Sequence, residues 1–301
     1  MRITLVHNPK AGYGGMKQEQ LLSLLRRAGY EPRDVSSKDD QIDRALEDPG
    51  EMVVVAGGDG TVARIAVKLA GREIPVAILP AGTANNIALS LGIRGSFESL
   101  IKSWSNAKPR KVDLGTARGR WGEQRFIESF GLGLLAQMMR NIEPMHNASR
   151  QKFQTRQEEF RHALRDMKKV IERTGSHEYA IEIDGVDRSG AYVLVEAMNI
   201  ACIGPNLCVA PQADVSDGML DLVLLPADQC DPFREYLARQ IEGEHNPPEL
   251  TTVRGKKMVI DPKGAPLHID DELHSESHDP LEPPGAIELT VNAGQVTFLL
   301  S

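Results

Sequence analysis

The segment MVVVAGGDGT, residues 52–61, decides the class of fold. Its first half is apolar and rich in valine without alternating polar residues, which is typical of a parallel strand buried on both faces. Its glycines predict a tight turn, and residues 61–70 continue with apolar side chains at helical spacing. A strand, a turn and a helix in this order form the crossover unit of an α/β sheet.

The same order recurs on both sides of this segment. Apolar runs at residues 3–6 and 76–79 each end in a turn that contains glycine or proline, and helical patterns follow at residues 20–28 and 84–91. Repeated strand–turn–helix units predict a parallel sheet with helices on its faces. We therefore expect an α/β N-terminal domain over residues 1–108.

Residues 109–301 follow a different pattern. Short apolar runs are separated by turns rich in glycine, proline and aspartate, with little helical periodicity between them. The predicted strands are residues 112–117, 125–129, 179–183, 192–199, 220–225, 258–261, 266–269 and 287–291. Many short strands predict a β-sandwich-like C-terminal domain. We leave open that its last strand returns to the first domain.

One helical pattern interrupts this domain at residues 150–173. Its apolar side chains fall largely at helical spacing, and it contains eight Lys or Arg against four Asp or Glu. A basic amphipathic helix can lie on an anionic membrane surface, or it can cover one face of a sheet with its basic side in water. We favour packing on the sheet, because most amphipathic helices pack in this way.

Composition and charge exclude several classes of protein. The chain has 301 residues, enough for two hydrophobic cores. Its net charge of −7 and its 5% aromatic residues argue against a nucleic-acid binder. No apolar run is long enough to span a bilayer, and no signal-peptide core precedes the first predicted strand. We expect no transmembrane segment and a cytoplasmic location.

The cysteines favour the same location. Cys202, Cys208 and Cys230 form an odd number and contain no CxxC pair. This usage indicates a reducing compartment and no disulfide framework. We expect Cys202 and Cys208 to behave as small buried apolar residues.

Three glycine-bearing turns of the first domain predict a binding site. They are HNPKAG at residues 7–12, GGDGT at residues 57–61 and PAGTANN at residues 80–86, and each follows a predicted strand. Ligands of open α/β sheets bind at the carboxyl ends of the strands, where glycines let backbone amides approach an anion. The Walker A pattern GxxxxGK(S/T) is absent, and no GxGxxG follows a strand. We predict a phosphate site built from several loops.

These turns and two later segments resemble the motifs of one enzyme family. NPKAG at residues 8–12 resembles the opening NPxxG turn of the lipid kinases, GGDGT resembles a signature that they share with NAD kinases, and PAGTANN is similar to PxGTxND. Residues 210–211 (AP) with DGMLD at 217–221 resemble AP…DGxLD, and LHIDDE at 267–272 resembles a strand ending in DGE. The five elements occur in the family order. The chain thus resembles the diacylglycerol kinase catalytic-domain family in its soluble bacterial form.

The resemblance implies an ATP- and Mg²⁺-dependent lipid kinase whose first domain has a NAD kinase/phosphofructokinase-like sheet. Such an enzyme transfers the γ-phosphate of ATP to a hydroxyl of a membrane-derived lipid, which is diacylglycerol-like, sphingoid or phosphatidylglycerol-like. The residues that match the nucleotide loops are Asn8, Pro9, Lys10, Ala11, Gly12, Ser37, Gly57, Gly58, Asp59, Gly60, Thr61, Gly82 and Thr83. Ser36 is the alternative to Ser37.

The resemblance also assigns catalytic and metal-binding roles. Asp270 aligns with the general base that takes the proton of the acceptor hydroxyl, and Glu272 lies beside it. Asp59 suits a catalytic magnesium ion, because hard cations take carboxylate oxygens and bridge phosphates. The positions that match ligands of a structural magnesium ion are Asp217 and the backbone oxygens of Asp214 and Met219.

Three positions depart from the family pattern. Arg64 stands where a glutamate follows GGDGT, Asn86 replaces the aspartate of GTxND, and Asp271 replaces the glycine of DGE. Asp271 adds a like charge beside Asp270, which can raise the pKa of that carboxyl group. The changes leave Asp59 and Asp270 in place and bear on how nucleotide and acceptor are held.

Two other functions stay open at this point. A NAD kinase would share GGDGT but not the NPxxG opening or the DGMLD segment. A nucleotide-binding protein without turnover would bind Mg–ATP and transfer nothing.

His268, His274 and His278 suggest a transition-metal site, but their spacing matches no standard motif. As partners we expect a lipid at the inner membrane surface, contacted peripherally, and no nucleic acid; a homodimer is left open.

Overall fold

The computed structural model describes residues 1–8, 17–39, 41–148, 153, 155–244, 246–274 and 285–300. The chain forms two compact units, the first made of Met1–Leu114 with Ala293–Ser301 and the second of Gly115–Asn292. Strands β5 (Lys108–Gly119) and β16 (Ile287–Leu300) run through the boundaries, so each of them belongs to both units.

The first unit is built around a parallel sheet. Its strands are β1 (Arg2–His7), β2 (Glu31–Ser36), β3 (Met52–Gly57), β4 (Pro75–Pro80) and the end of β16. They lie in the order β16-β4-β3-β1-β2, and neighbouring strands are parallel. Every residue of β3 is buried, as its valine-rich sequence predicts. The expected α/β class is confirmed.

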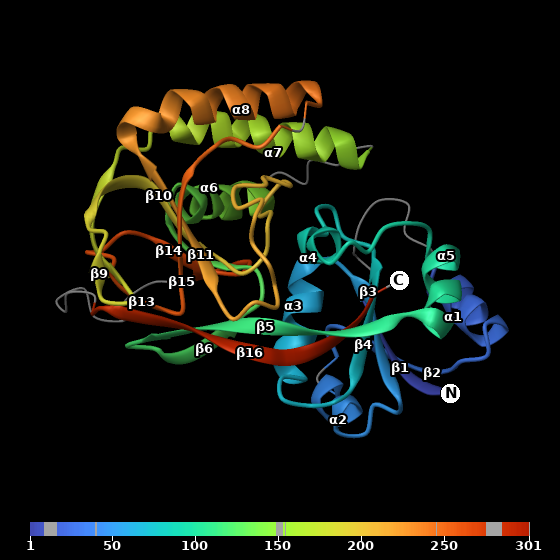
Figure 1. Ribbon diagram of the computed structural model, residues 1–301. Helices are drawn as coiled ribbons and strands as arrows, with labels where there is room; N and C mark the ends of the chain where they lie inside the picture. Colours follow the sequence, from blue (N-terminus) through green and yellow to red (C-terminus); the bar gives the residue numbers. More distant parts are fainter. Residues whose placement is uncertain are drawn as a thin grey trace. The chain divides into compact units, whose positions relative to one another are not determined.

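Helices cover both faces of this sheet. They are α1 (Gln18–Arg27), α2 (Ile42–Glu47), α3 (Asp59–Lys68), α4 (Asn86–Ser90), α5 (Phe97–Ser103) and the 3-10 helix η1 (Trp104–Asn106). Figure 1 shows α3 on one side of the strands, and α1 and α5 on the other. The apolar stripe of α1 buries Leu21 and Leu25 against the sheet. The helix predicted at residues 84–91 is shorter and begins at Asn86.

The second unit contains mostly antiparallel strands in two layers. Besides parts of β5 and β16, they are β6 (Gly122–Phe126), β7 (Ser129–Gly133), β8 (His177–Ile183), β9 (Val186–Asp187), β10 (Gly190–Met198), β11 (Leu220–Pro226), β12 (Thr251–Gly255), β13 (Lys257–Asp261), β14 (Leu267–Ile269) and β15 (Glu272–His274). One layer follows the order β15-β14-β7-β10-β11-β12, and β8 joins it to the layer that holds β13 and β16. Phe130 of one layer and Met258 of the other belong to one apolar core. This arrangement confirms the β-sandwich-like prediction.

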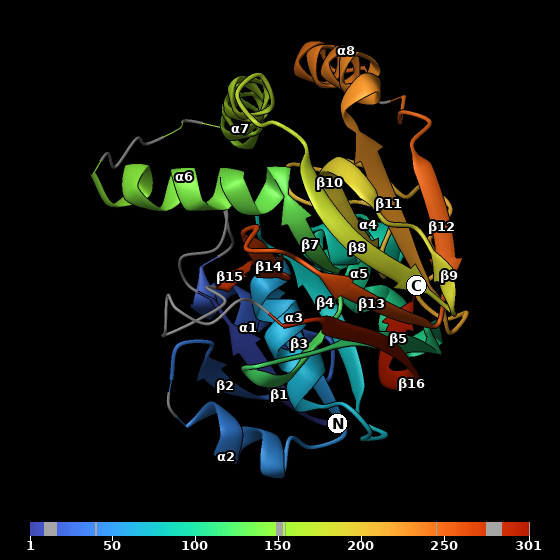
Figure 2. The same cartoon turned by 90° about the vertical axis from the view of Figure 1, so that its left-hand side faces the viewer.

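Helices cover the outer face of one layer of this unit. They are α6 (Leu134–Ala148), α7 (Arg156–Ile171) and α8 (Cys230–Glu242), with the 3-10 helix η2 (Ala227–Gln229) before α8. Figure 2 shows α6, α7 and α8 together on one side of β10 and β11. A second apolar core between them and the sheet includes Met167, Leu194 and Phe233. Neither α6 nor α8 is among the elements predicted from the sequence.

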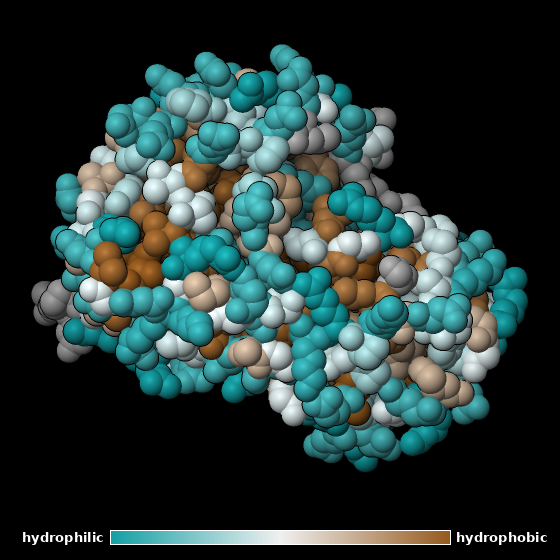
Figure 3. Space-filling model, viewed as in Figure 1, coloured by the Kyte–Doolittle hydropathy of each residue, from teal (hydrophilic) through white to brown (hydrophobic). Residues whose placement is uncertain are grey.

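Helix α7 tests whether residues 150–173 pack on the sheet or lie on a membrane surface. It begins at Arg156, and residues 150–152 and 154 lie outside the described residues. Met167 is fully buried beneath it, so the helix packs on the sheet as we expected. In Figure 3 the part of this unit where Figure 1 places α8 is covered mostly by hydrophilic side chains. Within the described part of the chain, no helix is long and apolar enough to cross a membrane.

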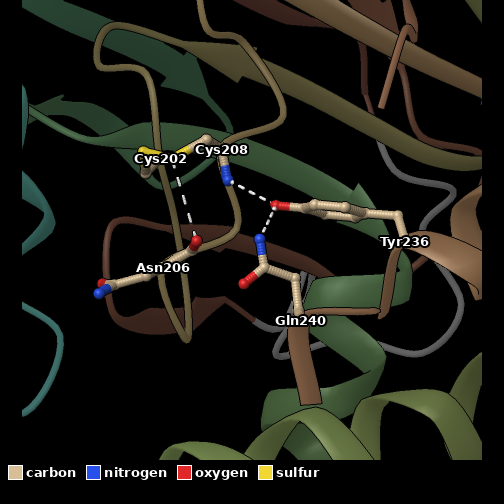
Figure 4. Close-up of a disulfide and its surroundings, with 5 residues drawn as sticks. All are labelled: Cys202, Asn206, Cys208, Tyr236 and Gln240. Atoms are coloured by element: carbon tan, nitrogen blue, oxygen red, sulfur yellow. Dashed lines mark hydrogen bonds between the residues drawn. A yellow bond between two sulfur atoms is a disulfide. The ribbon is translucent and has the colours of Figure 1, made fainter. Parts of the chain in front are cut away.

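The cysteines correct one prediction. Cys202 and Cys208 form a disulfide in the loop between β10 and β11, and Cys230 is a buried free thiol. Ile203 and Leu207 exchange two backbone hydrogen bonds, of 3.0 and 2.9 Å, which place the flanking cysteines opposite each other (Figure 4). The expectation of unpaired cysteines is therefore wrong, because the spacing of the two thiols does not reveal the hairpin that joins them.

The disulfide should stabilise the second unit. Closing so short a loop restricts the unfolded chain and contributes about 2 kcal/mol in the loop-entropy description. We expect the Cys202→Ser/Cys208→Ser variant to lose about that much free energy of unfolding in urea titrations. A reducing agent should destabilise the wild type to the same extent and leave the variant unchanged. A wild type whose urea midpoint ignores the reducing agent would contradict the pairing.

Candidate functional site

The carboxyl ends of β1, β2, β3 and β4 meet at one edge of the first unit's sheet. The register pairs His7 with Ser36 on one side and with Ala56 on the other, and it pairs Gly57 with Pro80. The described residues that directly follow these strands therefore lie along one edge. The chain winds from β1 towards β2 and then away from β1 in the opposite direction through β3 and β4. The β1–β3 edge is thus a topological switch point, where such sheets bind ligands.

Asn8 lies at this switch point. Its backbone N–H donates a 3.0 Å hydrogen bond to the carbonyl of Ala56, the residue that leads into the GGDGT turn. The first two glycine-bearing turns are therefore joined through the backbone. The remaining predicted residues of this turn, Pro9, Lys10, Ala11 and Gly12, lie outside the described residues.

Gly58 and Gly82 bring the GGDGT and PAGTANN turns into backbone contact. A Cβ placed on Gly82 would lie 2.3 Å from the Cα of Gly58, and one placed on Gly58 would lie 3.0 Å from the Cα of Gly82. No side chain fits between the two turns. Gly57 is restricted in another way, because a Cβ there would stand 2.7 Å from that of Thr61. The glycines are thus required by close approach.

Asn85 closes the PAGTANN turn. It adopts a left-handed conformation with φ of 57°, which asparagine tolerates better than most residues. Its side-chain oxygen accepts the N–H of Gly82 and its side-chain nitrogen donates to the carbonyl of Gly82, both at 2.8 Å. Thr83 is half-buried within this closed turn. The sequence prediction did not include Asn85, although its place before a helix and its tolerance of this conformation were a signal.

Asp59 ties the same two turns together through its side chain. It is the first residue of α3, and its carboxylate accepts the N–H of Ile87 at 2.9 Å. Burial raises the pKa of this carboxyl group, while the backbone N–H groups of Ile87, Asn86 and Asn85 act in the opposite direction. Asp59 therefore caps the start of α4 from α3. Gly60 and the buried Thr61 follow it in the first turn of α3.

Arg64, one of the departures from the family pattern, supports the turn after β2. Its guanidinium donates a hydrogen bond to the carbonyl of Ser37. Ser37 is buried, and its N–H donates to His7 at 2.9 Å, whereas Ser36 is half-buried. The positive charge that replaces a glutamate thus has a backbone acceptor at the edge where the predicted site lies.

In the second unit, backbone amides hold the carboxylate of Asp270. It accepts the N–H groups of Ile127, Glu128 and Ser129 at 3.2, 2.8 and 3.3 Å. Burial raises the pKa of Asp270 to about 7; the three N–H groups oppose the shift, and the charge of Asp271 adds to it. The group is a carboxylate of fixed orientation that can take up a proton near neutral pH.

The hairpin of β14 and β15 explains how Asp271 replaces a glycine. Ile269 pairs with Glu272, so Asp270 and Asp271 form a two-residue loop. Asp270 itself has a φ of 50°, and Asp271 is not among the residues of positive φ in the described chain. The turn therefore has no need of a glycine at position 271. Glu272 is exposed and accepts a 3.2 Å hydrogen bond from Gln124.

Asn199 and the buried pair of Glu196 and His268 surround this hairpin. Among them, the sequence singles out only His268, as part of a suggested transition-metal site whose spacing matches no standard motif. Asn199 donates its side-chain N–H to the carbonyl of Ile127 at 2.9 Å and so supports the loop that holds Asp270. His268 lies 3.0 Å from Glu196 between Nε2 and Oε1. Glu196 and His268 lie inside strands whose neighbouring residues are apolar and buried, and a polar side chain inside such a strand was the available signal.

The residues of the predicted structural magnesium site form hydrogen bonds and an ion pair within the chain. The carboxylate of Asp217 accepts the N–H of Met219 at 3.0 Å and forms an ion pair with the guanidinium of Arg254. Arg254 also lies 3.5 Å from the buried carboxylate of Asp221, and Asp214 accepts the hydroxyl of Ser216 at 2.8 Å. Arg254 provides the positive charge that the resemblance assigns to a metal ion. The magnesium site of Asp217 with the backbone oxygens of Asp214 and Met219 stays a prediction, in which a metal ion would compete with Arg254 for the carboxylate of Asp217.

Comparison with known proteins finds similar chains for both units. Residues 2–117 match the family described as "Diacylglycerol kinase catalytic domain", and residues 139–291, half of the chain, match the "YegS C-terminal NAD kinase beta sandwich-like domain". A diacylglycerol kinase of Mycobacterium tuberculosis is 23% identical over 286 residues, 90% of this chain and 89% of that protein. One of Bacillus subtilis is 26% identical over 256 residues, 81% of this chain and 80% of that protein.

A crystal structure shows the same fold. The crystal structure of a diacylglycerol kinase from Bacillus anthracis has a TM-score of 0.75 to this chain at 21% identity. The alignment covers 100% of this chain and 97% of the other.

An alanine at position 82 should force the two turns of the first unit apart. We expect Gly82→Ala to lose about 1–3 kcal/mol of free energy of unfolding in urea titrations, the usual cost of overpacking. Gly175→Ala is the matched control, because a Cβ at Gly175 has no atom within 4 Å. Equal stability of Gly82→Ala and the wild type would show that the turns separate at no cost.

When the positive charge of Arg254 is removed, the carboxylate of Asp217 should bind another cation. We expect Arg254→Gln to lower the melting temperature and millimolar Mg²⁺ to restore part of the loss, because Asp217 then lacks its cationic partner. Arg118→Gln is the control, since it removes an exposed ion pair of 2.8 Å with Glu123. If Mg²⁺ stabilises the wild type as much as the variant, a metal ion binds beside Arg254 and the interpretation is wrong.

Proposed function

This chain belongs to the diacylglycerol kinase catalytic-domain family, and from that membership we propose that it transfers the γ-phosphate of ATP to a hydroxyl of a membrane-derived lipid. Relatives named diacylglycerol kinase support a lipid acceptor. In this reaction the hydroxyl oxygen bonds to the γ-phosphorus, the bond from that phosphorus to the bridging oxygen breaks, and ADP leaves. The chain must therefore hold the phosphates, orient the acceptor and accept the hydroxyl proton.

The turns of the first unit are the phosphate site of this proposal. Helix α3 follows Gly58, and the first N–H groups of a helix have no acceptor within the helix. The contact between Gly58 and Gly82 keeps side chains away from this edge, so an anion can approach the amides. The described residues that we assign to the nucleotide are Asn8, Ser37, Gly57, Gly58, Asp59, Gly60, Thr61, Gly82 and Thr83.

Asp59 is the residue that we assign to the magnesium ion of Mg–ATP. A carboxylate offers about four lone-pair positions. The N–H groups of Ile87, Asn86, Asn85 and Asp59 itself act on these positions, and a hard cation would share the carboxylate oxygens with them. When bound, Mg²⁺ neutralises phosphate charge and fixes the phosphate geometry. Asp59 thus orients the cation while it caps α4.

The carboxylate of Asp270 is the observation that carries the proposal. A general base must be ionised near the working pH and basic enough to take a proton. A pKa of about 7 meets both needs, and three backbone N–H groups fix the direction in which the carboxylate points. We assign Asp270 as the base and the exposed Glu272 as a residue beside the acceptor.

The exposed side of α7 supports contact with a membrane. Arg161, Arg165 and Lys169 are exposed there, while the opposite side of the helix is buried in the core. Basic residues on an amphipathic helix are attracted to anionic lipid headgroups. A kinase with a lipid acceptor has to reach its substrate at such a surface.

Transfer of labelled phosphate from ATP to a panel of lipid hydroxyls in mixed micelles tests this function. We expect one lipid class to accept phosphate, and Asp270→Asn to lower the rate about 10²–10⁴-fold with the affinity for Mg–ATP unchanged. Asp59→Ala should instead weaken Mg–ATP binding. NAD is included as an acceptor, because transfer to NAD would favour a NAD kinase. Mg–ATP binding without transfer to any acceptor would contradict the proposal and leave a nucleotide-binding protein.

The pKa of Asp270 predicts the pH dependence of the rate. The base must be ionised, so kcat/KM should fall about tenfold per pH unit below pH 7 and level off above it. Because the charge of Asp271 raises this pKa, Asp271→Gly should move the acid limb to lower pH. The pH profiles of the two proteins are compared with the same lipid. An acid limb that does not move would remove Asp271 from the control of the base.

A further inference from the structure

We propose that Glu196 and His268 form a positioning pair for Asp270, in which His268 is an imidazolium that donates its Nδ1–H to the carbonyl of Asp270 and Glu196 holds the ring in place. The inference rests on the proposed function, because the role of Asp270 as base is itself a proposal. Neither residue touches the reacting atoms in this description. Both act through the backbone of the hairpin that presents the carboxylate.

Strand β7 brings the two residues together. Its Gly131 pairs with His268 of β14 on one side and with Glu196 of β10 on the other. The three residues therefore stand in one row across the sheet. Glu196 and His268 have exposed fractions of 0% and 3%. Their neighbours along the strands, among them Val195 and Leu267, belong to the sandwich core, so the pair lies on the opposite face, which the helices cover.

Gly131 provides the room for this pair. A Cβ at position 131 would lie 2.1 Å from Oε2 and 2.3 Å from Oε1 of Glu196. The carboxylate thus lies directly above the Cα of the central strand and reaches across it. Nε2 of His268 lies 3.0 Å from Oε1 of Glu196. A glycine inside a strand weakens that strand, and here the space left by the missing side chain is occupied by the carboxylate of Glu196.

The oxygens around the ring assign its protonation state. Nε2 faces the carboxylate of Glu196, and Nδ1 lies 2.9 Å from the carbonyl oxygen of Asp270. Nδ1 donates to the carbonyl oxygen, and Nε2 lies within ion-pair distance of Oε1 without an aligned hydrogen bond. An imidazolium, which has a proton on each ring nitrogen, suits both of these oxygens. A buried carboxylate without a cation would also be costly.

The electrostatics agree with this geometry. Burial is the largest single effect and lowers the pKa of His268, but Glu196 together with the carbonyl and the charge of Asp270 outweighs it, so the pKa is raised. Among the described residues, the titratable groups that act on His268 are Glu196 from β10, Asp270 from the hairpin turn and His274 from β15.

The hydrogen bond from His268 acts on a strained residue. Asp270 has a φ of 50°, a conformation that is unfavourable for a residue with a side chain. Its carboxylate is held by the amides of residues 127–129, and its carbonyl is held by His268. Two anchors on one residue fix both the peptide plane and the side chain. Loss of the carbonyl anchor should let the turn relax and rotate the carboxylate away from its amides.

A matched pair of variants separates positioning from mere stability. The side-chain nitrogen of Asn can stand near the Nδ1 position of His268, and that of Gln near the Nε2 position. His268→Asn therefore keeps a donor for the carbonyl of Asp270, and His268→Gln keeps one for Glu196. Both lose the buried ion pair and should be destabilised alike. We expect kcat to fall about tenfold or more in His268→Gln and clearly less in His268→Asn, with KM for ATP unchanged in both.

Nuclear magnetic resonance gives a readout that needs no activity. With ¹⁵N-labelled histidine, the wild type should show His268 with two protonated nitrogens at pH 8, assigned by its loss in His268→Asn. Glu196→Gln should leave the ring neutral at that pH. With ¹³C-labelled aspartate, the midpoint of the Asp270 titration, about 7 in the wild type, should move in His268→Gln and stay in His268→Asn. These measurements hold even when no lipid accepts phosphate, so failure of the proposed function is recognised separately.

Two results would overturn the proposal. A neutral His268 at pH 8 in the wild type would remove the imidazolium. Equal losses of kcat in His268→Asn and His268→Gln, together with equal movement of the Asp270 titration, would assign the pair a structural role alone.

Discussion

The backbone contact between Gly58 and Gly82 is the constraint on which the candidate nucleotide site depends. The parallel register of β1, β3 and β4 brings the turns to one edge, and absence of side chains at these two positions lets them touch. Asp59 then reaches from one turn to the start of α4 in the other. One carboxylate, two glycines and one register thus create an edge of backbone amides that includes the carboxylate of Asp59, which is the chemistry that phosphates and their cation need.

In the second unit, oriented backbone amides and the buried pair of Glu196 and His268 surround the candidate catalytic carboxylate. The amides of residues 127–129 orient the carboxylate of Asp270 before any substrate arrives. Burial and amide hydrogen bonds act on its pKa in opposite directions, and the result lies close to neutral pH. Groups that are oriented in the folded protein need no rearrangement during the reaction, which is the usual way in which folds contribute to catalysis.

Two of the three positions that depart from the family pattern, Arg64 and Asp271, find physical roles in this structure. Arg64 donates to the carbonyl of Ser37, and Asp271 occupies a turn whose left-handed residue is Asp270. Arg254 balances the charge of Asp217, where the resemblance predicts a metal ion. Arg64 and Arg254 are each matched by a partner far away in the chain. The departures therefore change how the site is supported and leave Asp59 and Asp270 in place.

By itself, the sequence determined those features that are encoded by patterns of neighbouring residues. The valine run at residues 52–56 and the glycines after it predicted a buried parallel strand and its turn, because periodicity and backbone freedom are properties of neighbouring residues. Only the tertiary structure decided the disulfide of Cys202 and the pairing of Glu196 with His268. A hairpin places the two thiols opposite each other, and the register of β7 brings together charges that lie far apart in the chain. Such contacts follow from strand register, which no local pattern records.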